Sequence, residues 1–140
     1  MQQLVEILKN EGLTLVVRQS DGSLYRGTGR GVSDLYDLLK ARRLDGAWVA
    51  DKVVGRGAAA LMIAGGVVRV HALTMSRPAV DLLKDSDLDY STDLLVDQIM
   101  NQKGDGQCPV EHLTSEAATA AECVPLIASF VNTIRNKTKE

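Results

Sequence analysis

Aromatic side chains are scarce in this chain of 140 residues, which has one Trp, one Phe and three Tyr. A protein that stacks the bases of single-stranded nucleic acid needs more of them. The chain also lacks an excess of charge of one sign, because 16 basic and 18 acidic residues leave a net charge of -2. No overall positive field gathers nucleic acid or anionic lipid, and a short basic pair such as Arg42-Arg43 is typical of solvated surface. We therefore expect no nucleic-acid partner and no membrane partner.

Cysteine occurs only at positions 108 and 123. Two cysteines in a chain of this length do not make a disulfide framework. No apolar run approaches the length of a membrane span, and the first residues lack the basic start and continuous apolar run of a signal peptide. These absences predict a cytoplasmic protein whose thiols are free unless its function uses them.

Several catalytic motifs are absent or incomplete. There is no phosphate loop of the Walker type, and the glycine-rich residues 27–32 place the last glycine of a dinucleotide fingerprint wrongly. No Cys-x-x-Cys pair accompanies the two histidines, His71 and His112, so we expect no bound metal. Ser115 has no evident base, so a serine triad is not supported there. We expect a protein that works without a cofactor.

Apolar periodicity and turn residues predict the elements of the N-terminal part. Apolar residues at helical spacing predict a first helix that ends at Gly12. A strand over residues 13–18, a turn at Asp21-Gly22 and a strand over residues 24–26 predict an antiparallel hairpin. Ser33 is a favoured N-cap residue, so a helix is expected to follow it.

The rest of the chain alternates predicted strands and helices. Strands are expected at residues 46–50, 67–73 and 88–90, the last a short edge strand. A helix is expected over the small-residue stretch 55–64 and should end at Gly65-Gly66. A second helix is expected after the cap Ser76, with Pro78 in its first turn, and a third from the cap Thr92 through Met100. The last is expected around Leu126, with Pro125 at or near its start. Alternation of this kind implies parallel strands with right-handed crossovers. We therefore expect one domain over residues 1–140, an α/β fold that forms a three-layer α/β/α sandwich with a mixed sheet and an N-terminal antiparallel hairpin.

Polar residues are expected beyond the carboxyl ends of two strands, where open α/β sheets bind ligands. Asp51 and Lys52 follow the predicted strand at residues 46–50. Ser76 ends the short segment, residues 74–76, that follows the predicted strand at residues 67–73. The helix start at Gly55 offers unpaired N–H groups and a positive dipole end to an anionic or carbonyl group, and Arg56 adds a cation. The alternative is purely structural, with Asp51 as a helix cap and Lys52 as solvated surface.

Cys108 stands between a glycine-rich turn and Pro109. If Pro109 is the first helical residue, the thiol lies at the positive end of a helix dipole, which favours the thiolate. The run Cys-Pro-Val-Glu also matches a capping box, in which Glu111 bonds back to the Cys108 N–H and raises the thiol pKa. The sequence leaves open whether Cys108 is a reactive thiol or a cap. Cys123, in an Ala-rich segment, is expected to be a buried small apolar residue.

Several of these segments together resemble a small bacterial and archaeal family of unknown function whose fold is similar to that of the cytidine deaminases. The resemblance extends over roughly residues 12–113 and rests on Ala50-Asp-Lys-Val-Val-Gly-Arg-Gly-Ala-Ala-Ala-Leu-Met62, Gly65-Gly-Val-Val68, Met75-Ser-Arg-Pro-Ala79 and Lys103-Gly-Asp-Gly-Gln-Cys-Pro-Val-Glu111. It implies a three-layer sandwich and a pocket where Asp51, Lys52 and Cys108 converge, with Gly55 and Arg56 at the start of the central helix and Glu111 beside the cysteine.

The chain departs from the cytidine deaminases at both zinc motifs. A zinc deaminase needs His- or Cys-x-Glu at one helix start and Cys-x-x-Cys at the next. Here Gly55-Arg-Gly-Ala58 and Cys108-Pro-Val-Glu111 occupy these places, so hydrolysis by zinc-activated water is not expected. Arg56 also stands where the family is expected to have lysine, which keeps the charge but changes its geometry.

Two functions follow from these residues. The first is a zinc-free enzyme that acts on a small polar molecule, with Cys108 as nucleophile, Asp51 as acid, base or orienting group, and Lys52 or a helix dipole stabilising negative charge. Gly55, Arg56, Ser76 and Glu111 are its expected substrate-binding residues. The second is a non-catalytic domain that binds or senses a small molecule. A C-terminal helical extension over about residues 116–137 is expected to be a packing helix or a homodimer contact.

Overall fold

The computed structural model describes residues 1–29, 32–99, 109–115, 117 and 119–139, without the side chains of Glu111 and of residues 136–139. Helices and strands follow one another as α1 (Gln2–Asn10), β1 (Leu15–Arg18), β2 (Leu24–Gly27), α2 (Ser33–Lys40), β3 (Trp48–Val54), α3 (Arg56–Gly65), β4 (Arg69–Ser76), α4 (Arg77–Leu83), β5 (Asp89–Val96), α5 (Pro109–Thr114) and α6 (Ala120–Lys139). The fold is a mixed α/β fold, as the alternation of apolar patterns predicts.

The five strands form one mixed sheet in the order β2-β1-β3-β4-β5. β1 pairs antiparallel with both β2 and β3, so the N-terminal hairpin joins the sheet through its first strand. β3, β4 and β5 are parallel, and α3 and α4 connect them. The predicted N-terminal hairpin and the predicted parallel strands are thus confirmed.

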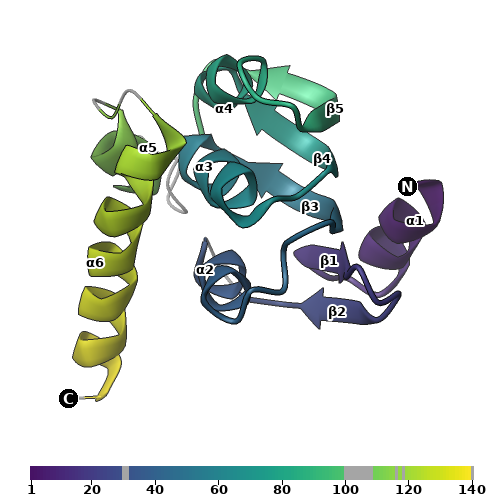
Figure 1. Ribbon diagram of the computed structural model, residues 1–140, viewed down its shortest axis with the longest axis horizontal. Coiled ribbons are helices and arrows are strands. Elements are labelled where there is room, and N and C mark those ends of the chain that lie inside the picture. The colour runs from purple at the N-terminus through teal and green to yellow at the C-terminus, as the bar shows by residue number, and fades with distance from the viewer. Residues whose placement is uncertain (30–31, 100–108, 116, 118, 140) are drawn as a thin grey trace.

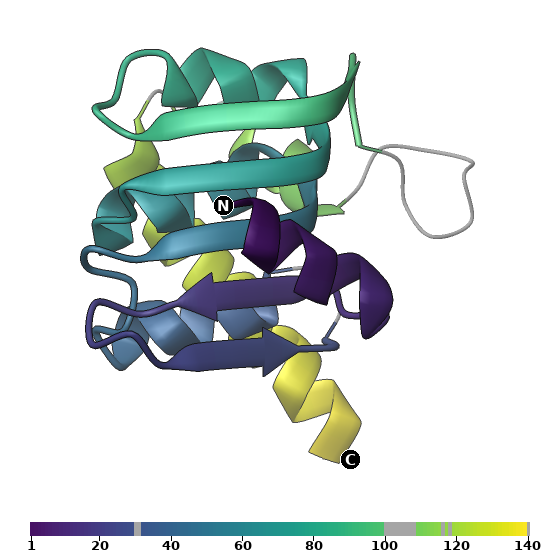
Figure 2. The ribbon, with the colours of Figure 1, turned by 90° about the vertical axis from the view of Figure 1, so that its right-hand side faces the viewer.

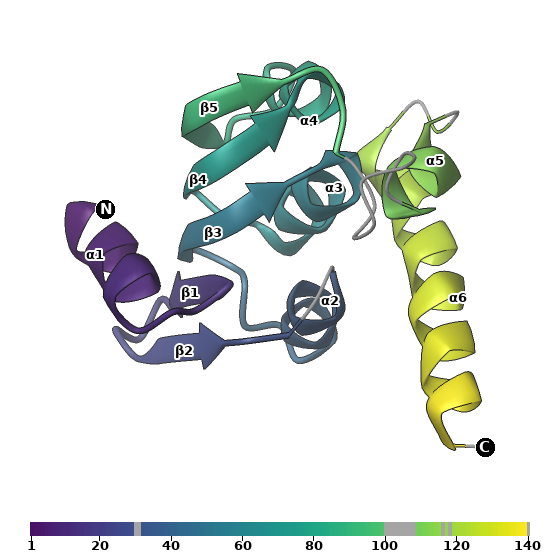
Figure 3. The same cartoon turned by 180° about the vertical axis from the view of Figure 1, so that it is seen from behind.

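Helices lie on both faces of the sheet (Figures 1 and 3). α2, α3 and α4 cover one face, and α5 and α6 lie outside them against α3. The main hydrophobic core fills the space between these helices and the sheet. On the opposite face α1 packs over β1 and β3 and encloses a smaller cluster around Leu4, Leu8, Val16 and Ala50. Figure 2 shows that, among the described residues, no helix covers the β5 side of this α1 face.

The helix α3 is built from residues small enough to lie between the sheet and α6. Ala58, Ala59 and Ala60 are buried on it, as the sequence predicts for this stretch. The helix ends at Gly66, whose φ of 87° is the left-handed conformation that glycine adopts without strain. The prediction that Gly65-Gly66 ends the helix is therefore confirmed.

The structure corrects four predicted boundaries. Thr92 lies inside the edge strand β5, so the helix expected from Thr92 is absent. The edge strand expected at residues 88–90 is present, but it is eight residues long, from Asp89 to Val96, and pairs in register with β4. Ser33 is the first residue of α2 rather than its cap, because the carbonyl oxygen of Val32 accepts the Tyr36 N–H. Pro125 lies inside α6, which begins five residues earlier than the proline suggests.

Candidate functional site

Asp51 lies inside β3 and not beyond its end, which corrects the sequence prediction. It pairs with Leu15 of β1 on one side and with Ala72 of β4 on the other. The strand continues because Val54 is fully buried in the main core, and the Asp51 side chain accepts the Val53 N–H at 3.3 Å. The residue therefore sits within the central strand, on the face covered by α2 and α3.

Burial gives the Asp51 carboxyl an unusual proton affinity. The residue is only 8% exposed. Burial raises its pKa from 3.8 to about 7, while hydrogen bonds from the Val53 and Lys52 N–H groups oppose that rise and the charge of Asp34 adds to it. A carboxyl with a pKa of about 7 exchanges its proton at neutral pH, which is the property of a general acid or base.

Asp34, on the first turn of α2, is a neighbouring charge that the sequence analysis missed. Its carboxylate accepts the Gly29 N–H at 3.1 Å. A Cβ atom at Gly27 or at Gly29 would come within 2.6 or 2.7 Å of Asp34 Oδ2, so the two glycines let this carboxylate approach the backbone. Thr14 holds the same loop, because its hydroxyl donates to the Gly27 and Gly29 carbonyl oxygens at 3.2 and 2.8 Å.

Tyr25 of β2 completes this group. Burial and the Asp34 carboxylate, which accepts a hydrogen bond from its phenol, raise the pKa of Tyr25 above 10.0. The stretch Gly27-Thr-Gly29, followed by Asp34, is the signal in the sequence that points to it.

Lys52, the next residue in β3, does not share the surroundings of Asp51. Its side chain is exposed, and successive side chains of a strand point to opposite faces. The structure therefore does not bring the Lys52 ammonium group to the Asp51 carboxyl.

Arg56 lies in the first turn of α3 and bonds to the chain that links α5 and α6. Its Nε donates to the Thr114 carbonyl oxygen at 3.0 Å, and its Nη2 donates to the carbonyl oxygen of Ala117. Gly55, the N-cap of α3, has an extended backbone, and no described side chain caps the helix. Arg56 thus has a structural task.

Ser76 is fully buried and has a capping role. Its hydroxyl accepts the Ala79 N–H at 3.2 Å at the start of α4, which confirms the predicted cap. Ser76 is the last residue of β4, whereas Asp51 pairs with Ala72 of the same strand. At 3.3 Å per residue the two lie about 13 Å apart along the strand direction. The predicted placement of Thr74 and Ser76 after the strand is wrong, since both belong to β4.

Cys108 lies outside the described residues, and the side chain of Glu111 is likewise not described. The helix that follows Cys108 is α5, and it begins at Pro109 as predicted. Val110 of α5 packs against Gly57, where a Cβ would come within 2.3 Å of Val110 Cγ1. The absence of a side chain at Gly57 therefore lets α5 contact the first turn of α3.

The other cysteine belongs to the core, as predicted. Cys123 is fully buried on α6, together with Ile127 and Val131, which follow it at helical spacing. Burial raises the pKa of the Cys123 thiol, and the charge of Arg56 partly opposes this effect. The C-terminal extension thus serves as a packing helix against α3.

The described residues contain no group of three His, Cys, Asp or Glu side chains arranged to hold a metal ion. Among the same residues, no helix is long and apolar enough to cross a membrane. The remaining candidate is a buried carboxyl in a central strand, Asp51, which feels the charge of a second carboxylate, Asp34.

The fold and this group of residues define the structural class of the protein: a mixed α/β protein with a buried acidic site. The family model described as TM1506, a domain of unknown function (DUF1893), matches residues 3–131. The chain belongs to this family, which confirms the resemblance to a family of unknown function. No curated protein matches the chain.

A solved structure is similar over most of the chain. It is a DUF1893 family protein (TM1506) from Thermotoga maritima, with 25% sequence identity and a TM-score of 0.84. The similarity covers 91% of this chain and 87% of that one. The arrangement of strands and helices described above is thus shared with another member of the family.

Proposed function

We propose that this protein is a zinc-free enzyme that transfers a proton to or from a small polar molecule, with Asp51 as its acid or base. The observation that carries the proposal is the pKa of Asp51, which burial raises to about 7. A group of this kind is present in both protonation states at neutral pH, so it donates and accepts a proton with equal ease.

The surroundings of Asp51 suit a neutral or anionic substrate that carries a carbonyl group. The uncapped N-terminus of α3 begins at Gly55, four residues after Asp51. At 3.3 Å per residue this helix start lies about 13 Å from Asp51 along the strand direction, so its N–H groups are proposed to bind a carbonyl or anionic group at the far end of the substrate.

Cys108 is the proposed nucleophile of the same site. Two observations support it: α5 begins at Pro109, directly after Cys108, and Val110 packs on Gly57 in the first turn of α3. In this proposal the Cys108 thiol and Asp51 act on the same substrate. Glu111, the third residue of α5, belongs to the proposed substrate-binding set.

We further propose that the fold is related to that of the cytidine deaminases. A mixed sheet with an antiparallel first strand and three parallel strands supports this relation. The helix start that would hold a zinc ligand in a deaminase carries Gly55, Arg56 and Gly57 instead. A catalytic cycle built on Asp51 and Cys108 accounts for a site that has lost those ligands.

The alkylation rate of Cys108 tests whether the two groups share one site. Iodoacetamide labelling is followed by mass spectrometry from pH 5.5 to 9.5, with buried Cys123 as the slow internal control. If the two groups share one site, ionisation of Asp51 near pH 7 adds a negative charge to that site and raises the pKa of the Cys108 thiol. We expect the midpoint for Cys108 to move to lower pH in Asp51→Asn.

The matched control is Asp87→Asn, which removes a carboxylate from an exposed loop position. It is expected to leave the Cys108 profile unchanged. Identical profiles for the wild type and Asp51→Asn would show that Asp51 and Cys108 act separately, and the proposed enzyme would lose its basis.

A non-catalytic small-molecule binding domain is the alternative. The engagement of Arg56 with two carbonyl oxygens and of Ser76 with a helix N-terminus favours it, because neither side chain then acts on a substrate. In that case Cys108 reacts at the rate of an unperturbed thiol, and ligands raise the melting temperature without being converted.

A further inference from the structure

A second group of polar residues lies on the α1 face of the sheet, away from Asp51. His71 of β4 stands between two residues of β5, since its Nδ1 is 2.7 Å from Ser91 Oγ and its Nε2 is 3.1 Å from Asp93 Oδ1. Register explains the arrangement: His71 pairs with Ser91, and residues two apart on a strand share a face. The sheet itself therefore builds a serine–histidine–aspartate chain.

The hydrogen bonds among Ser91, His71 and Asp93 determine which of their atoms donate a proton and which accept one. An ionised Asp93 carboxylate only accepts, so the proton of the neutral His71 ring resides on Nε2. Nδ1 is then an acceptor, and the Ser91 hydroxyl donates its proton to it. Lys9 of α1 lies 3.9 Å from the other oxygen of Asp93. Ser91 is thus hydrogen-bonded to a base that is itself oriented by a carboxylate.

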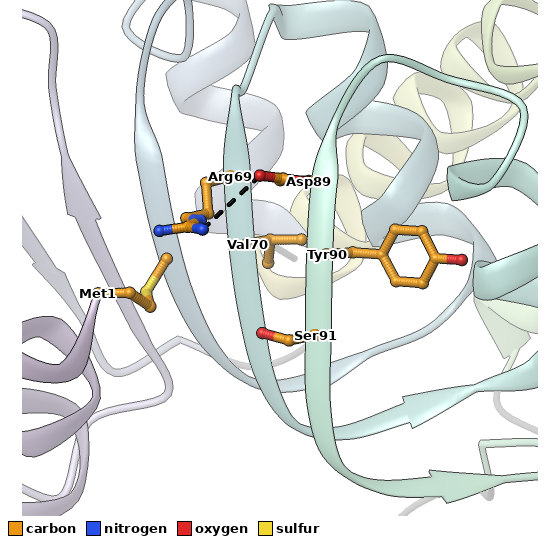
Figure 4. Close-up of a pocket in the computed structure, with 6 residues that line it drawn as sticks. All are labelled: Met1, Arg69, Val70, Asp89, Tyr90 and Ser91. Carbon is orange, nitrogen blue, oxygen red and sulfur yellow. Dashed lines mark ion pairs between the residues drawn. The ribbon is translucent and has the colours of Figure 1, made fainter.

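Ser91 also lines a cleft on the same face. The cleft has a volume of about 150 Å³ and is lined by Met1, Arg69, Val70, Asp89, Tyr90 and Ser91. Figure 4 shows Met1, Arg69 and Ser91 on one side of β5, with the Tyr90 ring turned to the other. Benzene fits a cavity of about this volume, so the cleft suits a group of only a few carbon atoms.

Arg69 supplies a positive charge to this cleft. Its guanidinium lies 3.7 Å from the Asp89 carboxylate and 5.1 Å from the centre of the Trp48 ring. These contacts hold a cation at the wall that Ser91 lines. A cation in that place stabilises an oxygen that becomes negative during acyl transfer.

We propose that Ser91 is a nucleophile for acyl transfer, with His71 as its general base and Asp93 as the group that orients His71. The substrate class is a small ester with a short acyl group that fits the cleft. Asp51 lies on the opposite face of the sheet, so this activity and the function proposed for Asp51 are independent.

The reaction needs only water as a second reactant. Ser91 Oγ forms a bond to the ester carbonyl carbon while its proton passes to His71 Nδ1, and the carbonyl oxygen takes the negative charge. The bond from carbon to the alcohol oxygen then breaks, and the alcohol leaves with the proton from Nδ1. Water attacks the acyl group on Ser91 by the same sequence, which releases a carboxylic acid and restores the serine.

A fluorophosphonate probe tests the proposal on the full chain. Ser91 displaces fluoride from the probe and gains a stable adduct, which peptide mass spectrometry locates. We expect the adduct on Ser91, no adduct there in Ser91→Ala, and labelling slowed at least tenfold in His71→Gln because general base catalysis contributes about 100-fold or more. Hydrolysis of p-nitrophenyl acetate is expected to fall in the same order.

Asp93→Asn provides a variant with little risk to folding, because the Asp93 side chain is half exposed. It removes the charge that orients His71 and is expected to slow labelling several-fold. Ser23→Ala, at an exposed turn where the hydroxyl donates to Asp21, is the control and leaves labelling of Ser91 unchanged. An adduct at Ser91 no stronger than at Ser23, or equal labelling in the wild type, His71→Gln and Asp93→Asn, would overturn the proposal.

Discussion

Arg56 in the first turn of α3 donates a hydrogen bond from Nε to the carbonyl oxygen of Thr114 at the end of α5, at 3.0 Å. A second donor of the same guanidinium bonds to the Ala117 carbonyl oxygen. One side chain thus joins the central helix to the segment that leads into α6. The sequence predicts that Arg56 binds a substrate, whereas in the structure its guanidinium holds two parts of the fold together.

Replacing Arg56 with Ala is therefore expected to destabilise the fold. Two carbonyl oxygens lose a charged donor, which costs about 1–3 kcal/mol of unfolding free energy. Arg56→Lys keeps the charge but supplies one compact ammonium group instead of a planar fork, so it is expected to recover only part of the loss. Urea denaturation measures both, with Arg77→Ala, in an exposed ion pair with Asp97, as the control of small effect.

Gly57 is expected to tolerate no side chain while Val110 is present. A Cβ at this position would lie 2.3 Å from Val110 Cγ1. Gly57→Ala should therefore cost about 1–3 kcal/mol by overpacking, although Ala favours a helix by about 0.5–1 kcal/mol over Gly.

A double-mutant cycle measured by urea denaturation separates these two effects. In a Val110→Ala background the clash is gone, so Gly57→Ala should be nearly neutral or stabilising. An equal cost of Gly57→Ala in both backgrounds would mean that α5 does not pack on α3 through Val110. Because α5 follows Cys108 directly, the same result would weaken the proposed approach of the cysteine to α3.

The central part of the fold was predictable because its signals are local. Small residues from Ala58 to Ala60 could only form a buried helix, and the alternation around them implied parallel strands. β5 was not predictable in this way, since Thr92, Leu94 and Leu95 have no strong local preference. Pairing with β4 decides the matter, and that pairing joins residues about twenty positions apart.

The candidate sites show the same limit. Asp51 attracted notice as a charged residue in an apolar run, yet its pKa depends on burial under α2 and α3 and on Asp34, which only the fold brings near. His71 was dismissed for want of metal-ligand spacing. Its contacts with Ser91 and Asp93 follow from strand register, which the sequence does not reveal once β5 is taken for a helix.

Thr119 marks the start of α6 more clearly than Pro125 does. Its hydroxyl accepts the Glu122 N–H at 3.2 Å, and Thr119-Ala-Ala-Glu122 matches the capping-box pattern that the sequence analysis overlooked. Thr119→Ala is expected to cost about 1 kcal/mol, whereas Thr119→Ser keeps the acceptor and most of the stability. Thermal melting of both variants by circular dichroism checks this, and equal melting points would show that the hydroxyl contributes nothing.

Ionisation of Asp51 should lower the free energy of unfolding as pH rises from about 4 to about 7. The native state keeps a proton on Asp51 up to a pKa of about 7, whereas the unfolded chain releases it near 3.8. In that interval the unfolded state binds fewer protons, so each increase in pH favours unfolding. The accumulated cost is about 4 kcal/mol above pH 7, and none of it applies below pH 3.8, where both states are protonated.

Asp51→Asn removes this cost while its amide oxygen still accepts the Val53 N–H. The variant is therefore expected to match the wild type near pH 4.5 and to become more stable than it by pH 8. Urea denaturation at half-unit steps of pH measures the difference, with Asp87→Asn as the exposed control that shows no such trend. A difference between Asp51→Asn and the wild type that stays constant from pH 4.5 to 8 would contradict a raised pKa. The proton-transfer role proposed for Asp51 would then have no physical basis, because its carboxyl would be ionised throughout that range.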